Sequence, residues 1–233
     1  MPEITETIFK KPPANEVRLG VQFQNSLEVA DSRSKFHAQV KKDFPHVVMP
    51  ELKNLTFYLA DYSLHSENNA DHLAIGMNYF RLVTTSYPGF NQFGESFRRS
   101  LSIFVDCYEI KSFLSFAMSY HNILPVGEFE SFEDCFSIQV VVPGILQNSL
   151  WAARGRLIFN IDGNYVTVDL EPRLENDKLT SYTMNLLYAT QGDLRISSSK
   201  NEITQLMDSS HNALKQIFFS ILQERYISYL ANL

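Results

Sequence analysis

The sequence predicts an α+β protein in which helices pack on antiparallel sheets. Three observations point to this class. Residues 16–24 alternate apolar and polar side chains, which is typical of a half-buried strand. Residues 88–108 repeat Phe, Leu and Tyr at steps of three and four, the period of an amphipathic helix. Asp162-Gly163 separates two apolar runs, and this dipeptide is typical of a tight hairpin between antiparallel strands.

Length and composition fit a globular protein. The chain has 233 residues, enough for one large or two small domains. Hydrophobic residues make up 45% and charged residues 20%, which excludes global disorder. The 26 acidic residues outnumber the 20 basic ones and give a formal net charge of −6. Because binding to a phosphate backbone needs a basic surface, nucleic acid is not an expected partner.

The first half of the chain predicts a strand, helix, strand, strand, helix, strand order. Residues 1–15 contain three prolines and are expected to form an extended arm. The elements that follow are a strand at 16–24, a helix at 31–44, strands at 55–62 and 73–84, a helix at 88–108 and a strand at 113–122. This order is that of a ferredoxin-like βαββαβ unit. Residues 16–126 are therefore predicted to form a ferredoxin-like subdomain.

The second half, residues 127–233, predicts an antiparallel meander followed by a long helix. A helical turn is expected at 130–135, and the strands are expected at 137–142, 150–161, 165–170 and 182–189. Ser199 and Glu202 have the spacing of a capping box at a helix start. An unbroken helix from there to Tyr229 would be roughly 45 Å long. Since Phe219 and Tyr226 lie off its main apolar stripe, a second side of this helix also needs covering, by the first subdomain, a second copy or another protein.

No catalytic, cofactor or metal motif is present in the sequence. Cys107 and Cys135 are not in a Cys-x-x-Cys pair and are expected to be buried, reduced thiols. His65 and His72 could meet across a hairpin beside Glu67, but the interpretation favoured here is a solvated loop. The N-terminal residues lack the apolar region of a secretory signal, and no run approaches about 20 apolar residues. A cytoplasmic location without membrane contact is expected.

Three segments together resemble a family of functionally uncharacterised prokaryotic proteins. These are residues 12–23 (PPANEVRLGVQF), the mid-chain strand end 120–123 (YHNI) and the C-terminal helix segment 211–218 (HNALKQIF). The family has roughly 250 residues, which suits one or two domains, and is sporadically distributed among genomes. Its usual Arg before the mid-chain Tyr is Ser119 here. The resemblance implies a prokaryotic, cytoplasmic setting and transfers no chemistry.

Five residues are the candidate binding residues. His211 lies on the apolar side of the last helix, and Tyr120 and Asn122 end a strand. Phe219 lies off the helix stripe, and Trp151 is the only tryptophan. Trp151 could anchor a protein partner or lie at the edge of the core, and His211 could contact a ligand or be a buried, hydrogen-bonded histidine.

Two functions are kept open. The first is a non-enzymatic protein-binding or accessory protein of a prokaryotic system, related to defence or toxin control or chaperone-like, with possible self-association through the C-terminal helix. The alternative is a small-molecule-binding protein or enzyme whose site is assembled between the two sheets. An exposed apolar groove favours the first function, and an enclosed apolar pocket containing His211, Tyr120 or Asn122 favours the second.

Overall fold

The structure is a computed structural model that describes residues 9, 12–49, 61–129, 131–139, 153–191 and 195–233. The helices are α1 (Leu27–Asp31), α2 (Arg33–Val40), α3 (Phe90–Tyr108), α4 (Phe132–Cys135), α5 (Lys200–Ile221) and α6 (Glu224–Asn232). The strands are β1 (Ala14–Gln22), β2 (His46–Val48), β3 (Tyr62–His65), β4 (Asp71–Gly76), β5 (Tyr79–Thr84), β6 (Ser112–Phe113), β7 (Ser115–Pro125), β8 (Gly155–Ile161), β9 (Asn164–Glu175), β10 (Lys178–Ala189) and β11 (Ile196–Ser197). The mixed helix and strand class predicted from the sequence is confirmed.

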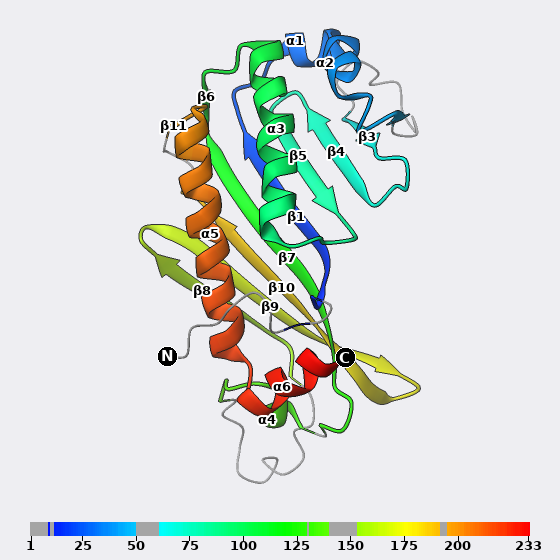
Figure 1. The fold of residues 1–233 in the computed structure, drawn as a ribbon. Coiled ribbons are helices and arrows are strands. Elements are labelled where there is room, and N and C mark those ends of the chain that lie inside the picture. The colour runs from blue at the N-terminus through cyan, green and yellow to red at the C-terminus, as the bar shows by residue number, and fades with distance from the viewer. Residues whose placement is uncertain (1–8, 10–11, 50–60, 130, 140–152, 192–194) are drawn as a thin grey trace.

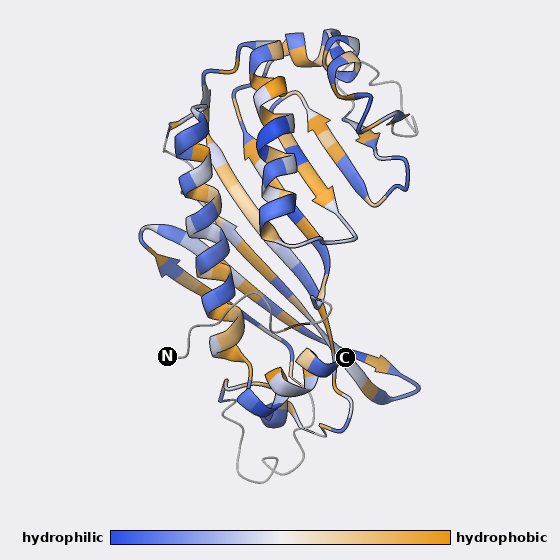
Figure 2. Cartoon of the chain, viewed as in Figure 1, coloured by the Kyte–Doolittle hydropathy of each residue, from blue (hydrophilic) through white to orange (hydrophobic). Residues whose placement is uncertain are grey.

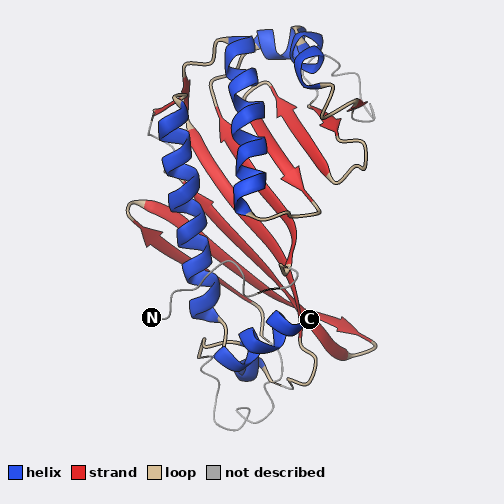
Figure 3. Ribbon diagram, viewed as in Figure 1, coloured by secondary structure: helices blue, strands red, loops and turns tan. Residues whose placement is uncertain are grey.

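Nine of the described strands form one large sheet in the order β2-β3-β4-β5-β1-β7-β10-β9-β8, and β6 and β11 form a second, two-stranded sheet (Figures 1 and 3). Every described strand pair is antiparallel. The expected arrangement, a ferredoxin-like sheet in one half and a separate meander in the other, therefore needs correction. The strands of both halves belong to the same sheet.

Strand β7 is what joins the two halves. Its side chains alternate between half-buried and buried over all eleven residues, because successive side chains point to opposite faces of the sheet. One edge pairs with β1 and the other with β10, where Tyr120 lies opposite Leu186. Backbone N–H and C=O groups on an unpaired strand edge lack partners. One long strand on each side of β7 provides such partners along both of its edges. The boundary predicted near residue 126 falls where β7 leaves this shared sheet.

Helices α3 and α5 cover the same face of the large sheet (Figure 1). The α3 stripe predicted from the sequence is buried, including Phe93, Phe97 and Phe104. The α5 side chains Ile203, Met207 and Leu214 are buried against the sheet as well. In Figure 2 both helices carry hydrophilic residues on the side turned away from the sheet. The core is therefore a single layer between one helical layer and one sheet.

Of two hairpins in the large sheet, the sequence predicts one and misses the other. The Asp162-Gly163 turn is confirmed, and both residues have positive φ. The run 73–84, predicted as one strand, is two strands, because the chain reverses between Gly76 and Tyr79. A Cβ on Gly76 would lie 2.4 Å from the Tyr79 ring, so the turn needs glycine there.

A third hairpin was missed in the sequence. Residues 176 and 177 are Asn and Asp, both have positive φ, and they join β9 to β10. Both strands are consequently longer than predicted. Pro172 lies inside β9, and a proline is a poor indicator of a continuing strand.

The C-terminal helix is not continuous to Tyr229. Ser199 caps α5 by accepting a hydrogen bond from the Glu202 amide, which is one half of the predicted capping box, but the helix stops at Ile221. Leu222 is extended and buried, and the backbone at this point bonds to residues 135–137 instead. The chain then turns into α6, which packs on α4. This turn buries Leu222 and Leu230 together with Tyr226, which was expected to lie on a second side of one helix.

Gly127 lies directly against Tyr229 of α6, and this contact supports a test. It has φ +58, and a Cβ there would lie 2.1 Å from the Tyr229 hydroxyl oxygen. Gly163 also has positive φ, at +79, but nothing lies within 4 Å of its Cβ position. We expect Gly163→Ala to lose about 1 kcal/mol of unfolding free energy from backbone strain alone, and Gly127→Ala to lose more. Urea denaturation of both variants measures this, and equal losses would show that Tyr229 does not pack on Gly127.

Both cysteines are free and buried, as predicted. Burial first, and the neighbouring Asp134 carboxylate second, raise the pKa of Cys135 to about 12. Burial also raises the pKa of Cys107. Since the thiolate is the nucleophilic form of cysteine, neither residue is suited to nucleophilic chemistry near neutral pH. Within the described residues, no helix combines the length and apolar character needed to cross a membrane.

Candidate functional site

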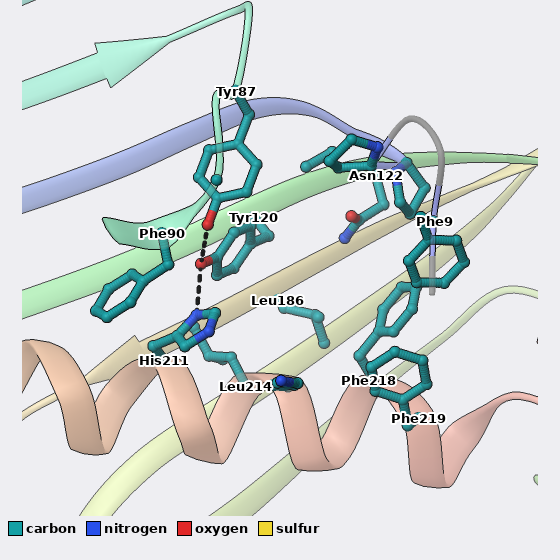
Figure 4. Close-up of a pocket in the computed structure, with 15 residues that line it drawn as sticks. Phe9, Tyr87, Phe90, Tyr120, Asn122, Leu186, His211, Leu214, Phe218 and Phe219 are labelled. Atoms are coloured by element: carbon teal, nitrogen blue, oxygen red, sulfur yellow. Dashed lines mark hydrogen bonds between the residues drawn. The ribbon is translucent and has the colours of Figure 1, made fainter. Parts of the chain in front are cut away.

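An apolar pocket of about 150 Å³ lies between α5 and the sheet, beside the start of α3 (Figure 4). We call it the α5 pocket. Its described lining residues are Phe9, Pro12, Pro13, Ala14, Tyr87, Gly89, Phe90, Tyr120, Asn122, Leu186, His211, Leu214, Lys215, Phe218 and Phe219.

The pocket lies where only one of the two helices, α5, covers the sheet. Where α3 and α5 cross, they approach closely, and a Cβ on Gly94 would lie 2.9 Å from the Met207 methyl carbon. One turn further, Phe90 packs on His211, and there α3 begins. Helix α5 continues from His211 to Ile221 without α3 beside it (Figure 1). The sheet below this part of α5 is therefore covered incompletely.

One wall of the pocket is polar and hydrogen-bonded. The hydroxyl oxygens of Tyr87 and Tyr120 are 3.1 Å apart, and the Tyr120 oxygen is 2.8 Å from Nδ1 of His211 (Figure 4). The His211 ring lies flat on the Phe90 ring, with centroids 4.0 Å apart and planes 2° from parallel. The stacking and the hydrogen bond hold the imidazole in one orientation. A ligand group that reaches this wall meets hydroxyls and an imidazole whose positions are already fixed.

The opposite end of the pocket is aromatic. Phe9, from the N-terminal segment, stacks on Phe219 with ring centroids 5.8 Å apart, and it meets Phe218 edge-on at 6.1 Å. Leu186 and Leu214 are fully buried and separate this end from the polar wall (Figure 4). The side chains between them are mainly apolar, so an apolar ligand body fits there.

Asn122 is a fixed part of the pocket lining. It is 4% exposed, and its side-chain nitrogen donates to the Met184 carbonyl 3.1 Å away on β10. Met184 lies directly opposite Asn122 in the sheet. The amide is thus held by the neighbouring strand, as a buried polar side chain requires.

The structure brings four of the five candidate binding residues to this one pocket: His211, Tyr120, Asn122 and Phe219. The fifth, Trp151, lies outside the described residues. Sequence reasoning missed Phe9, Tyr87, Phe90 and Lys215. Lys215 follows His211 by four residues, so helical spacing alone places it on the same face of α5. Phe9 and Tyr87 come from irregular segments, for which no periodic signal exists.

Other groups of polar side chains lie outside the α5 pocket. His65 and His72 do meet across their hairpin, with stacked rings 4.8 Å apart. Burial first, and then a neighbouring histidine, lower the pKa of each of them, so both favour the neutral form. Within the described residues, no group of three or more His, Cys, Asp or Glu side chains is placed to hold a metal ion.

The densest basic points of the sequence are engaged by carboxylates. Arg156 bonds Asp169 at 2.6 Å, and Arg99 lies 3.2 Å from Asp43. Arg154 pairs with Glu171 at 2.5 Å. These three arginines are therefore paired with carboxylates of their own chain.

The comparisons with known proteins add no relative. No protein-family model matches the chain, and no curated protein is similar to it at a significant level. The resemblance to sporadically distributed prokaryotic proteins stays a prediction.

Proposed function

We propose that the protein binds one compact, mainly apolar small molecule in the α5 pocket. The observation that carries this proposal is the pocket itself, an apolar space of about 150 Å³ with a hydrogen-bonding wall at one side. This is the second of the two functions that the sequence left open. Of the features that separate the two functions, the meeting of His211, Tyr120 and Asn122 in one apolar pocket favours it.

The size of the pocket limits the ligand class. An apolar cavity of roughly 150 Å³ accepts a molecule of the size of benzene, whereas sites for drug-sized ligands occupy about 300–1,000 Å³. One aromatic ring or a short aliphatic chain therefore fits between Leu186, Leu214 and Phe218. A nucleotide or a long lipid would extend beyond this space.

The polar wall gives the ligand an orientation. A single hydroxyl or carbonyl on the ligand finds hydroxyl and imidazole partners near Tyr87, Tyr120 and His211. Asn122 and Lys215 are the other polar side chains of the described lining. A few placed polar groups in an apolar pocket are the usual source of specificity for small ligands. Benzyl alcohol, with one ring and one hydroxyl, has this chemistry and is a suitable probe.

Titration calorimetry with benzyl alcohol tests the proposal. We expect saturable binding of one molecule with a Kd of about 0.1–1 mM, reasonable for eight non-hydrogen atoms. Ala14 is half-buried and lines the pocket, so Ala14→Trp should fill the space and abolish binding. Asn15 is exposed and absent from the described lining, so Asn15→Trp is the matched control and should bind normally. Absent binding to the native protein, or equal binding by both variants, would overturn the proposal.

Binding of another protein stays a second candidate, and one observation favours it. On the sheet face away from α5, Ile158 and Leu187 are 65% and 40% exposed. Both lie opposite Thr167 in the register, so they flank it in one row across β8, β9 and β10. An exposed apolar row of this kind fits a protein contact better than a small ligand. By contrast, Phe219, the residue expected to mediate self-association, is stacked on Phe9 of its own chain.

A further inference from the structure

We infer that the ligand of the α5 pocket is a small apolar monocarboxylate, with its carboxylate held by Lys215. This inference rests on the proposed function and adds the charge and the chemical class of the ligand.

The charge of the pocket is the first argument. Of the described lining residues, Lys215 alone carries a full charge at neutral pH, and no aspartate or glutamate is among them. The protein as a whole has a formal net charge of −6. The described lining therefore carries one positive charge and no carboxylate, which favours an anionic ligand there over a cationic one.

The neighbours of Lys215 on α5 are the second argument. A helix brings a side chain next to those three and four residues away, and for Lys215 these are His211, Asn212, Phe218 and Phe219. None is acidic. The ion pairs among the described residues do not include Lys215 either. Among the described residues no carboxylate pairs with Lys215, so this half-buried lysine, which lines an apolar space, is suited to accept a carboxylate from a ligand.

The order of groups along α5 gives the ligand its shape. His211 lies at the polar wall, Leu214 in the apolar middle, and Lys215 one turn after His211 on the same face. A carboxylate beside Lys215 and within reach of the Tyr120–His211 wall leaves the rest of the ligand in the apolar space. With about 150 Å³ available, that rest is one ring or a short chain. Phenylacetate has this form.

Titration calorimetry with three ligands of nearly equal shape tests the inference. The probes are phenylacetate, its neutral amide phenylacetamide and the cation phenethylammonium. We expect phenylacetate to bind about tenfold more tightly than phenylacetamide, a difference of about 1.4 kcal/mol, and phenethylammonium to bind most weakly. Lys215→Met keeps the length of the side chain without its charge and should remove the preference for phenylacetate. Lys215→Arg should keep it.

Lys200 provides the matched control. It is an exposed lysine at the start of the same helix, away from the described pocket lining, so Lys200→Met should leave the preference unchanged. Equal affinity of the native protein for acid and amide, or an unchanged preference in folded Lys215→Met, would overturn the inference while the proposed function stands. If none of the three probes binds, the result contradicts both the inference and the proposed function.

Discussion

Phe104→Ala should lower the free energy of unfolding by about 3–5 kcal/mol, the range for truncating a buried phenylalanine. Phe104 is fully buried on α3, at the centre of an aromatic cluster. Its ring lies 4.8 Å from that of Phe80 on β5 and 5.5 Å from that of Phe23, which directly follows β1. The rings of Phe36 and Tyr108 pack on it as well, at 5.4 and 5.0 Å. Removing this ring leaves a cavity bordered by α2, α3 and the sheet.

Urea denaturation followed by circular dichroism measures this loss. Phe104→Leu fills part of the cavity and should cost less than Phe104→Ala. Ser102, exposed on the same helix, gives the control, and Ser102→Ala should stay within about 0.5 kcal/mol of the native protein. If Phe104→Ala loses less than about 1.5 kcal/mol, α3 does not pack on the sheet through this cluster.

Tyr226→Ala should also cost about 3–5 kcal/mol, because this residue docks α6 after the break in the C-terminal helix. Tyr226 is fully buried, and its hydroxyl donates to the Pro125 carbonyl at 3.0 Å. Its ring meets Phe129 at 5.1 Å and Phe136 at 6.3 Å. The side chain thus ties α6 to the end of β7 and to the segment around α4.

Tyr226→Phe separates the two contributions. It keeps the ring and removes one hydrogen bond, so a loss of about 0.5–1.5 kcal/mol is expected from the same denaturation experiment. A loss in Tyr226→Ala no larger than that in Tyr226→Phe would mean that the ring contributes nothing. In that case α6 would not be docked by Tyr226.

The elements that the sequence predicts well are those whose signal is local. The α3 stripe and the Asp162-Gly163 turn depend on residues within a few positions of one another, and both are found as expected. The cap at Ser199 is equally local. In these segments the spacing of apolar side chains and the backbone preference of single residues suffice to define the structure.

What the sequence does not reveal depends on contacts between distant residues. The pairing of β7 with β10 joins residues about 60 positions apart, and no local pattern specifies it. The break at Leu222 follows from its bridge to Phe136, which the continuous helical stripe conceals. Without that break, Phe219 and Tyr226 suggest a partner surface on one long helix, whereas each contacts its own chain.

The candidate site shows the same limit. His211 and Tyr120 were singled out separately, for the apolar face of a helix and for the end of a strand. Their hydrogen bond joins positions 91 residues apart, so their meeting in one pocket follows from the sheet and from α5 lying over it. The pocket volume itself depends on where α3 begins relative to α5. Neither helix contains that information alone.

A crystal structure of the protein grown with benzyl alcohol tests the central claim most directly. The account predicts electron density for one ring between Leu186, Leu214 and Phe218, with the hydroxyl within hydrogen-bond distance of Tyr120 or His211. Surrounding side chains that close the pocket, with the ligand bound elsewhere or not at all, would contradict it.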